Sequence, residues 1–245
     1  MGIFDKLFKK RKGSKCTMCG NYIREMKEKQ DLRGLCKALN LNIEPDIRAQ
    51  AARAIGEMLT EKTLEIETIL GGKLTKDNFV ELLSELCGNI GMRADYLRKK
   101  LLDELITEKG LDMQPLIFLT LLYHTIFDEA ESVRYESAKT LIDLEGDTAI
   151  NVLATIAAKG NIGMKELELP WGGSEAVLYY SKKKIGLITE SEVRCNAIEV
   201  LGKLAAKIPD IRNVLTTLAM KDDDSFVRRK AKEVLKEIEA KKSQK

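Results

Sequence analysis

The chain has 245 residues, of which 44% are hydrophobic and 32% are charged, and its formal net charge is +3. A chain of this length can bury a large core as one elongated domain or two compact ones, and so small a charge does not by itself indicate a nucleic-acid partner. Four prolines and 5% aromatic residues favour helix over sheet. Five cysteines, an odd number with no secretory signal before them, predict a reduced, cytoplasmic protein. No apolar run approaches the ~18 residues that a membrane-spanning helix needs.

Residues 1–30 form a basic leader that we expect to be separate from the body, residues 31–245. The first 29 residues hold nine Lys and Arg against three Asp and Glu. Within residues 1–12, one helical face gathers the aliphatic and aromatic side chains, Ile3, Phe4, Leu7 and Phe8. Such faces flanked by lysine suit an anionic membrane surface. The pattern predicts peripheral membrane contact through residues 1–12, and the alternative is a short helix that docks on the body.

The leader also carries a Cys-x-x-Cys pair, Cys16 and Cys19, followed by Gly20. The pair resembles a zinc knuckle, in which this spacing directs two thiolates at one ion. Cys36 is the expected third ligand, and the fourth is open between Cys87 and a residue of a partner chain. A redox pair or a structurally inert pair are the alternatives, although no βαβ pattern surrounds the cysteines as in redox folds. Zinc is therefore the one cofactor we consider.

The body reads as a series of helices with short breaks between them. Apolar residues recur with helical period, glycines separate the segments, and Asp, Glu or Ser precede several of them as caps. The expected helices span residues 31–39, 45–59, 62–70, 76–87, 92–108, 113–127, 132–144, 148–158, 191–206, 208–220 and 225–241.

A short marker recurs in this series: an aliphatic residue, then Arg, with a small residue four positions and an aliphatic residue eight positions after the first. We expect the aliphatic residues to face neighbouring helices and the small residue to let helix axes approach closely. The Arg lies beside an acidic turn, so that a pair such as Asp224–Arg228 is expected to bridge consecutive units. The markers begin at Ile47, Val133, Val193 and Val227, with a degenerate copy at Met92-Arg93.

The segment from Ile208 to Leu235 resembles a HEAT-like repeat of the subtype named after phycobilisome lyases. It has an apolar helix, the acidic loop Asp222-Asp223-Asp224, and then Val-Arg-x-x-Ala-x-x-x-Leu. The likeness is good over 128–158 and 189–240 and fair over 44–70. It implies an all-α fold, a right-handed α-solenoid of about five helix pairs. Such repeats specify a fold strongly and a function hardly at all.

The irregular insert near 160–188 interrupts the repeat spacing. It contains the chain's only tryptophan, Trp171, and aromatic and basic residues after it. Insertions in repeat proteins often lie on the binding face, and aromatic residues are frequent interface anchors. We expect this insert to bind a partner, the alternatives being that Trp171 fills the core or that the insert grips nucleic acid. The candidate binding residues are Trp171, Tyr179, Tyr180, Lys182, Lys183 and Lys184.

The residues offer no pattern typical of catalysis. His124 is the single histidine, and it lies in an apolar helix where we expect it to be buried and hydrogen-bonded. The sequence therefore predicts a non-enzymatic scaffold or adaptor that binds a protein and has no small-molecule substrate. The alternatives are a nucleic-acid-binding HEAT-like protein and a zinc- or redox-responsive regulatory adaptor.

Overall fold

A computed structural model describes residues 17–40, 44–60, 106–107, 110–111, 114–166, 189–205 and 208–243. The described elements are helices, except for strand β1 (Ile106–Thr107), which pairs antiparallel with β2 (Gly110–Leu111). The all-α prediction is confirmed. The helix expected over 92–108 is wrong at its end, because Ile106 and Thr107 lie in this strand pair, where β-branched residues are favoured.

The first three helices pack together: α2 (Thr17–Glu28), α3 (Leu32–Asn40) and α4 (Pro45–Thr60). Helix α2 belongs to the stretch assigned above to the leader, yet its Ile23 and Met26 are 6% and 1% exposed in the common core. Packing against the body thus begins before residue 30. The helical period of these two apolar residues explains why α2 turns that face inward.

Six further helices complete the described fold, and their ends lie close to the expected ones except in α10. They are α8 (Gln114–Phe127), α9 (Glu131–Glu145), α10 (Asp147–Glu166), α12 (Glu190–Leu204), α13 (Pro209–Lys221) and α14 (Ser225–Ser243). Local chemistry sets two starts: Thr189 and Glu192 form a capping box before α12, and Pro209 opens α13. Helix α10 was expected to stop by Gly160, but it changes direction there, at φ 57°, and continues to Glu166.

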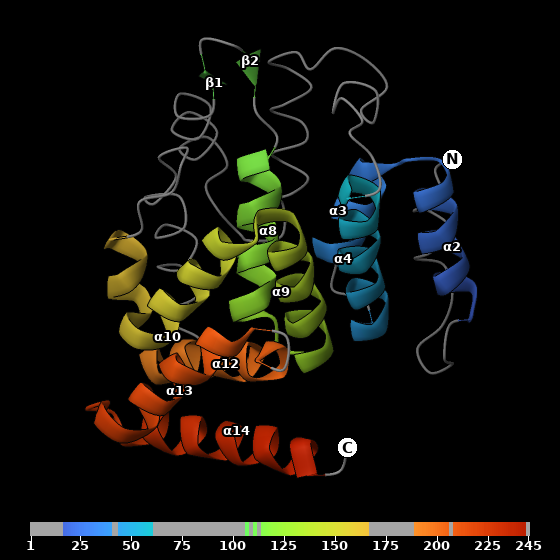
Figure 1. The fold of residues 1–245 in the computed structure, drawn as a ribbon. Helices are drawn as coiled ribbons and strands as arrows, with labels where there is room; N and C mark the ends of the chain where they lie inside the picture. The colour runs from blue at the N-terminus through green and yellow to red at the C-terminus, as the bar shows by residue number, and fades with distance from the viewer. Residues whose placement is uncertain are drawn as a thin grey trace.

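The helices pack as consecutive pairs, α3 with α4, α8 with α9, α10 with α12, and α13 with α14. Figure 1 shows α4 and α9 running alongside each other, whereas α12 and α14 cross the lower part of the view. Helix α4 packs directly against α9, although residues 61–130 separate them in sequence.

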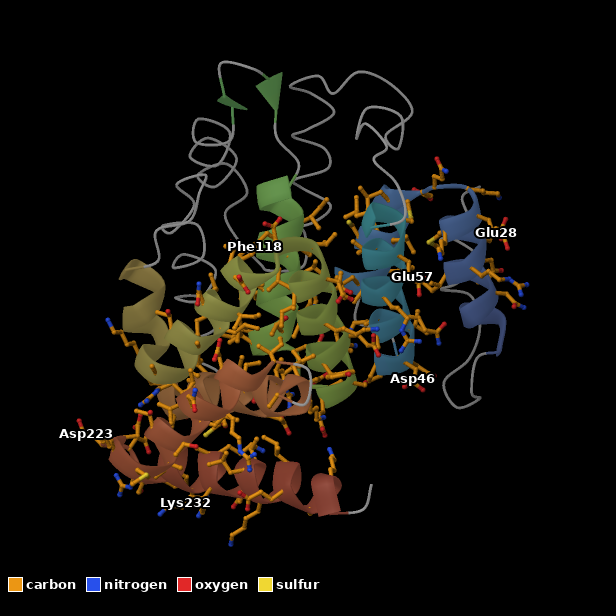
Figure 2. All side chains as sticks on the ribbon, in the orientation of Figure 1. Glu28, Asp46, Glu57, Phe118, Asp223 and Lys232 are labelled. Atoms are coloured by element: carbon orange, nitrogen blue, oxygen red, sulfur yellow. The ribbon has the colours of Figure 1, made fainter. Side chains whose placement is uncertain are left out.

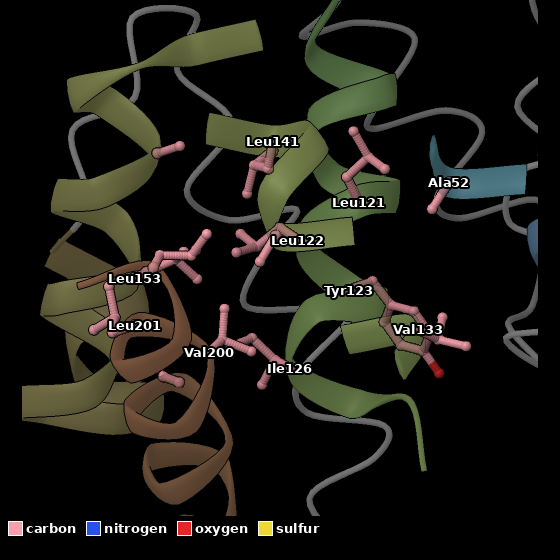
Figure 3. Packing of buried hydrophobic residues seen from close by; sticks show 14 of the residues in the cluster. Ala52, Leu121, Leu122, Tyr123, Ile126, Val133, Leu141, Leu153, Val200 and Leu201 are labelled. Carbon is pink, nitrogen blue, oxygen red and sulfur yellow. The ribbon is translucent and has the colours of Figure 1, made fainter. Parts of the chain in front are cut away.

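The core follows the markers. In each full copy the first aliphatic residue and the small residue four positions later are buried. The aliphatic residue at the eighth position is buried in three copies and partly buried in the last, at Leu235. Figure 3 shows this packing around α8, with Leu121 towards Ala52 on one side and Leu122 towards Leu153 on the other. None of the described helices is long and apolar enough to cross a membrane.

Candidate protein-binding surface

Four helices carry the marker, α4, α9, α12 and α14, and we call them the marker helices. In two of them, α4 and α12, the marker arginine binds the acidic turn that precedes another marker helix. Arg48 donates from Nε and Nη2 to the carboxylate of Asp128, at 3.2 and 2.8 Å. Arg194 donates from Nη2 to the carboxylate of Asp222, and its Nε donates to the carbonyl of Ala157 at 3.0 Å. Both carboxylates lie five residues before the next marker. The expectation that these arginines bridge consecutive units holds for these two pairs.

The pair expected above, Asp224–Arg228, is not the contact that forms. Arg228 donates from Nη1 to the backbone carbonyls of Asp222 and Asp223, at 2.5 and 2.9 Å. The carboxylate of Asp224 accepts instead from the backbone N–H of Phe226 at 2.8 Å and from the hydroxyl of Ser191. Asp224 therefore caps the start of α14, because its short side chain reaches the unpaired amides of the first turn.

Asp128 is the centre of a buried polar cluster. Its Oδ2 lies 3.1 Å from Nδ1 of His124, and its Oδ1 accepts from the N–H of Ala130 at 2.9 Å. The side chains of Arg48, His124 and Asp128 are 5–7% exposed. The prediction that His124 is a buried, hydrogen-bonded residue is confirmed. Burial raises the pKa of Asp128, but hydrogen bonds from His124 and Arg48 outweigh burial and lower that pKa to about 2.

Asp128 makes stability depend on acid pH. Because its pKa is lowered to about 2 from an ordinary 3.8, its contribution is full above that ordinary value and is lost as pH falls towards 2. We expect the free energy of unfolding to fall steeply between these values, and Asp128→Asn to flatten that slope. Urea unfolding followed by circular dichroism at several acid pH values measures it. Equal slopes in the two proteins would contradict the assignment.

A second contact recurs at the same register with its charges reversed. Between α4 and α9, Arg53 pairs with Glu136 through Nε at 3.1 Å. Between α12 and α14, Glu199 occupies the Arg53 position and Lys230 the Glu136 position, with their charged atoms 3.4 Å apart. Such partly exposed pairs each contribute about 0–1 kcal/mol, so they indicate register more than stability.

A third shared contact brings a glycine against the following helix. Gly56 and Gly202 each lie nine residues after their marker, and each faces the residue seven after the next marker, Thr140 or Val234. A Cβ at Gly56 would lie 2.8 Å from Cγ2 of Thr140, and one at Gly202 would lie 1.9 Å from Cγ1 of Val234. Only glycine permits these approaches. The α4–α9 and α12–α14 contacts are thus built alike.

The partly exposed side of α9, α12 and α14 carries mixed charge. Glu199 accepts from both Arg134 of α9, at 2.6 Å, and Lys230 of α14. Lys203 pairs with Glu131 and lies 5.8 Å above the ring of Tyr135. Burial, and then the nearby Lys241, lowers the pKa of Lys203. We call this the mixed-charge face. Figure 2 shows how charged side chains cover the outside of the described helices.

The residues predicted to bind a partner, from Trp171 to Lys184, lie outside the described residues, as does residue range 1–12. The described chain resumes at Thr189, directly before α12. Sequence reasoning found the marker arginines but missed the mixed-charge face. A signal for it existed, because Glu199 and Lys203 lie four residues apart on one face of α12.

The predicted zinc ligands are only partly described. Cys16 and the side chain of Cys19 lie outside the described residues, and Cys36 is 1% exposed in α3. The backbone at Cys19 is already helical, in the first turn of α2. Across the parts of the chain that the structure describes, no group of three His, Cys, Asp or Glu residues is placed to hold a metal ion. Zinc binding stays a prediction.

Comparison with known proteins adds no relative. No protein-family model, curated protein or solved structure matches the chain.

Proposed function

We propose that the chain is a HEAT-like, right-handed α-solenoid that acts as a non-enzymatic scaffold and binds another protein. The observation that carries the proposal is the shared register of the α4–α9 and α12–α14 contacts. Arginine–aspartate, charge-pair and glycine contacts recur at the same offsets from two different markers. Stacked units that repeat one contact are what a solenoid requires, and such stacks present extended binding surfaces.

Helix α14 supports the same proposal as a terminal unit. The positions that hold Ile198 and Gly202 in α12, buried against the next unit, hold Lys232 and Lys236 in α14, and both lysines are exposed. Lys232 lies on the side of α14 away from α12 (Figure 2). A polar outer face is the expected property of a capping unit.

A protein is the partner that we propose. The mixed-charge face alternates acidic and basic groups around Tyr135, and polar rims of this kind suit protein interfaces more than the uniformly positive surface that nucleic acid requires. The insert residues Trp171, Tyr179 and Tyr180 are the proposed anchors, since aromatic side chains dominate interface energies.

The test compares partner binding by wild type, Trp171→Ala and the matched control Phe226→Ala, which removes a 58% exposed aromatic outside the insert. Affinity purification from source-cell extract nominates a partner, and titration calorimetry with that purified protein measures affinity. We expect Trp171→Ala to weaken binding at least about tenfold, since truncating an anchor costs about 2 kcal/mol. Phe226→Ala should bind as wild type does.

Two results would overturn the proposal. One is equal affinity for wild type and Trp171→Ala. The other is the absence of any retained protein, together with single-stranded RNA or DNA that binds at low salt and is released as salt rises. That second pattern would assign Lys182, Lys183 and Lys184 to phosphate binding.

A further inference from the structure

The contact between α8–α9 and α12 lacks the features that the other two marker-helix contacts share. The residue five positions before Val193 is Ile188, where the other acidic turns have aspartate. The residue nine positions after Val133 is Ile142, where α4 and α12 have glycine. Neither the arginine–aspartate pair nor the glycine approach can form here. This contact therefore lacks both of the features that align α4 with α9 and α12 with α14.

Polar groups take a large part in this contact. Arg134 pairs with Glu199 at 2.6 Å, Asn196 donates to the carbonyl of Ile126 at 2.8 Å, and Lys203 pairs with Glu131. Nε of Arg134 is buried without a hydrogen-bond partner in the described part of the chain. Apolar packing is supplied by α8, whose Ile126 lies beside Val200 of α12 (Figure 3). Leaving a buried donor unpaired makes a contact weaker than a fully satisfied one.

A single exposed glycine connects the two sides. Gly146 lies between α9, which ends at Glu145, and α10, which begins at Asp147, and its φ is 53°. A Cβ placed on it would meet no atom within 4 Å. Gly160 has a similar φ of 57°, but its Cβ would collide with Glu190 and approach Arg194. Of these two glycines, Gly160 is held by packing and Gly146 is not.

We propose that the described chain forms two rigid blocks, residues 17–145 and 147–243, that rotate relative to each other about Gly146. Each block contains one copy of the shared register, α4–α9 in the first and α12–α14 in the second. The contact of α8–α9 with α10 and α12 is the joint between them, and the mixed-charge face spans it. The joint does not depend on the proposed scaffold function, because it follows from the contacts alone.

The joint is sensitive to salt. Its ion pairs lie at 11–18% side-chain exposure for Arg134 and Glu199 and at 29–56% for Lys203 and Glu131. At 1 M salt the screening length falls to about 3 Å, so partly exposed pairs weaken while glycine approaches and apolar contacts persist. Raising the salt concentration should therefore loosen the joint, whereas each block should keep its internal register through its glycine approach and apolar contacts.

The experiment measures distances by double electron–electron resonance on the full chain, with spin labels on a genetically encoded ketone amino acid. One label pair, Asn21 with Lys232, spans the joint; the control pair, Asn21 with Asp143, lies within the first block. All three positions are exposed. We expect the first distance distribution to broaden and shift from low to high salt, and the control distribution to stay constant.

Variants give an independent readout at low salt. Arg134→Gln should broaden the Asn21–Lys232 distribution, whereas the matched variant Arg53→Gln, which removes an ion pair inside the first block, should not. The wild-type salt series needs no variant, so a poorly folded Arg134→Gln protein does not remove the test. An Asn21–Lys232 distance distribution as narrow as the control distribution at every salt concentration would contradict rotation of the two blocks about Gly146.

Discussion

Asp128→Ala should lower the free energy of unfolding by about 3–5 kcal/mol, because it removes the carboxylate that pairs with the buried guanidinium of Arg48. Arg48 is 5% exposed and reaches Asp128 across 80 residues of sequence, so the substitution removes a contact between α4 and the turn before α9. It also removes one partner of His124 and the hydrogen bond from the N–H of Ala130. Equilibrium unfolding in urea at neutral pH, followed by circular dichroism, measures the change.

Two further proteins interpret that result. Asp223→Ala removes an exposed aspartate from the other acidic turn, and we expect a change within about 0.5 kcal/mol. The double variant Arg48→Met with Asp128→Leu removes both charges, and it should recover part of the lost stability, since apolar groups of similar volume can replace a buried ion pair. If Asp128→Ala lowers the free energy of unfolding no more than Asp223→Ala does, Arg48 and Asp128 do not form a buried pair.

Gly202→Ala should destabilise the protein by about 1–3 kcal/mol, the usual cost of overpacking, even though alanine favours a helix over glycine by about 1 kcal/mol. The reason is the α12–α14 contact, where an added Cβ would lie 1.9 Å from Cγ1 of Val234. A β-branched side chain in a helix has one preferred rotamer and cannot turn away cheaply. Thermal and urea unfolding both report the change.

A double-mutant cycle with Val234→Ala isolates this contact. Val234 is 4% exposed, so Val234→Ala alone also destabilises the protein by removing buried methyl groups. In the double variant the methyl group added by Gly202→Ala fills part of the space that the valine side chain leaves. We expect the double variant to be more stable than the sum of the two changes predicts, by about 0.5–3 kcal/mol. Strict additivity would show that Gly202 and Val234 are not in contact.

Local structure was the part of the fold that sequence predicted well. The period of the apolar residues and the residues that cap helices gave most described helix positions, because both depend on neighbours within a few residues. The marker gave core positions for the same reason: Val133, Leu141, Val193 and Leu201 are all fully buried. The Ile106–Thr107 strand was missed because a helical segment and a short apolar strand are alike over so few residues.

Pairing between distant segments was the part that sequence did not supply. The markers at Ile47 and Val133 were expected to be copies of one unit, but their order along the chain does not say that α4 packs against α9. The α4–α9 contact depends on which aspartate Arg48 reaches, and candidate acidic residues lie on both sides of it in the chain. For the candidate binding residues, composition named the insert and its aromatic side chains, and their mutual geometry stays a prediction.

By itself, the sequence of this protein determined that the chain is helical, which helix faces are apolar, and that Arg48, Arg134, Arg194 and Arg228 have a structural role. Tertiary structure alone decided which turn each arginine binds and that two glycines set the approach of marker helices. It also decided that the arginine–aspartate and glycine contacts are not repeated between α9 and α12. The physical reason is range. A helix is encoded by side chains one turn apart, whereas register between helices depends on charges and shapes that meet only after the chain has folded.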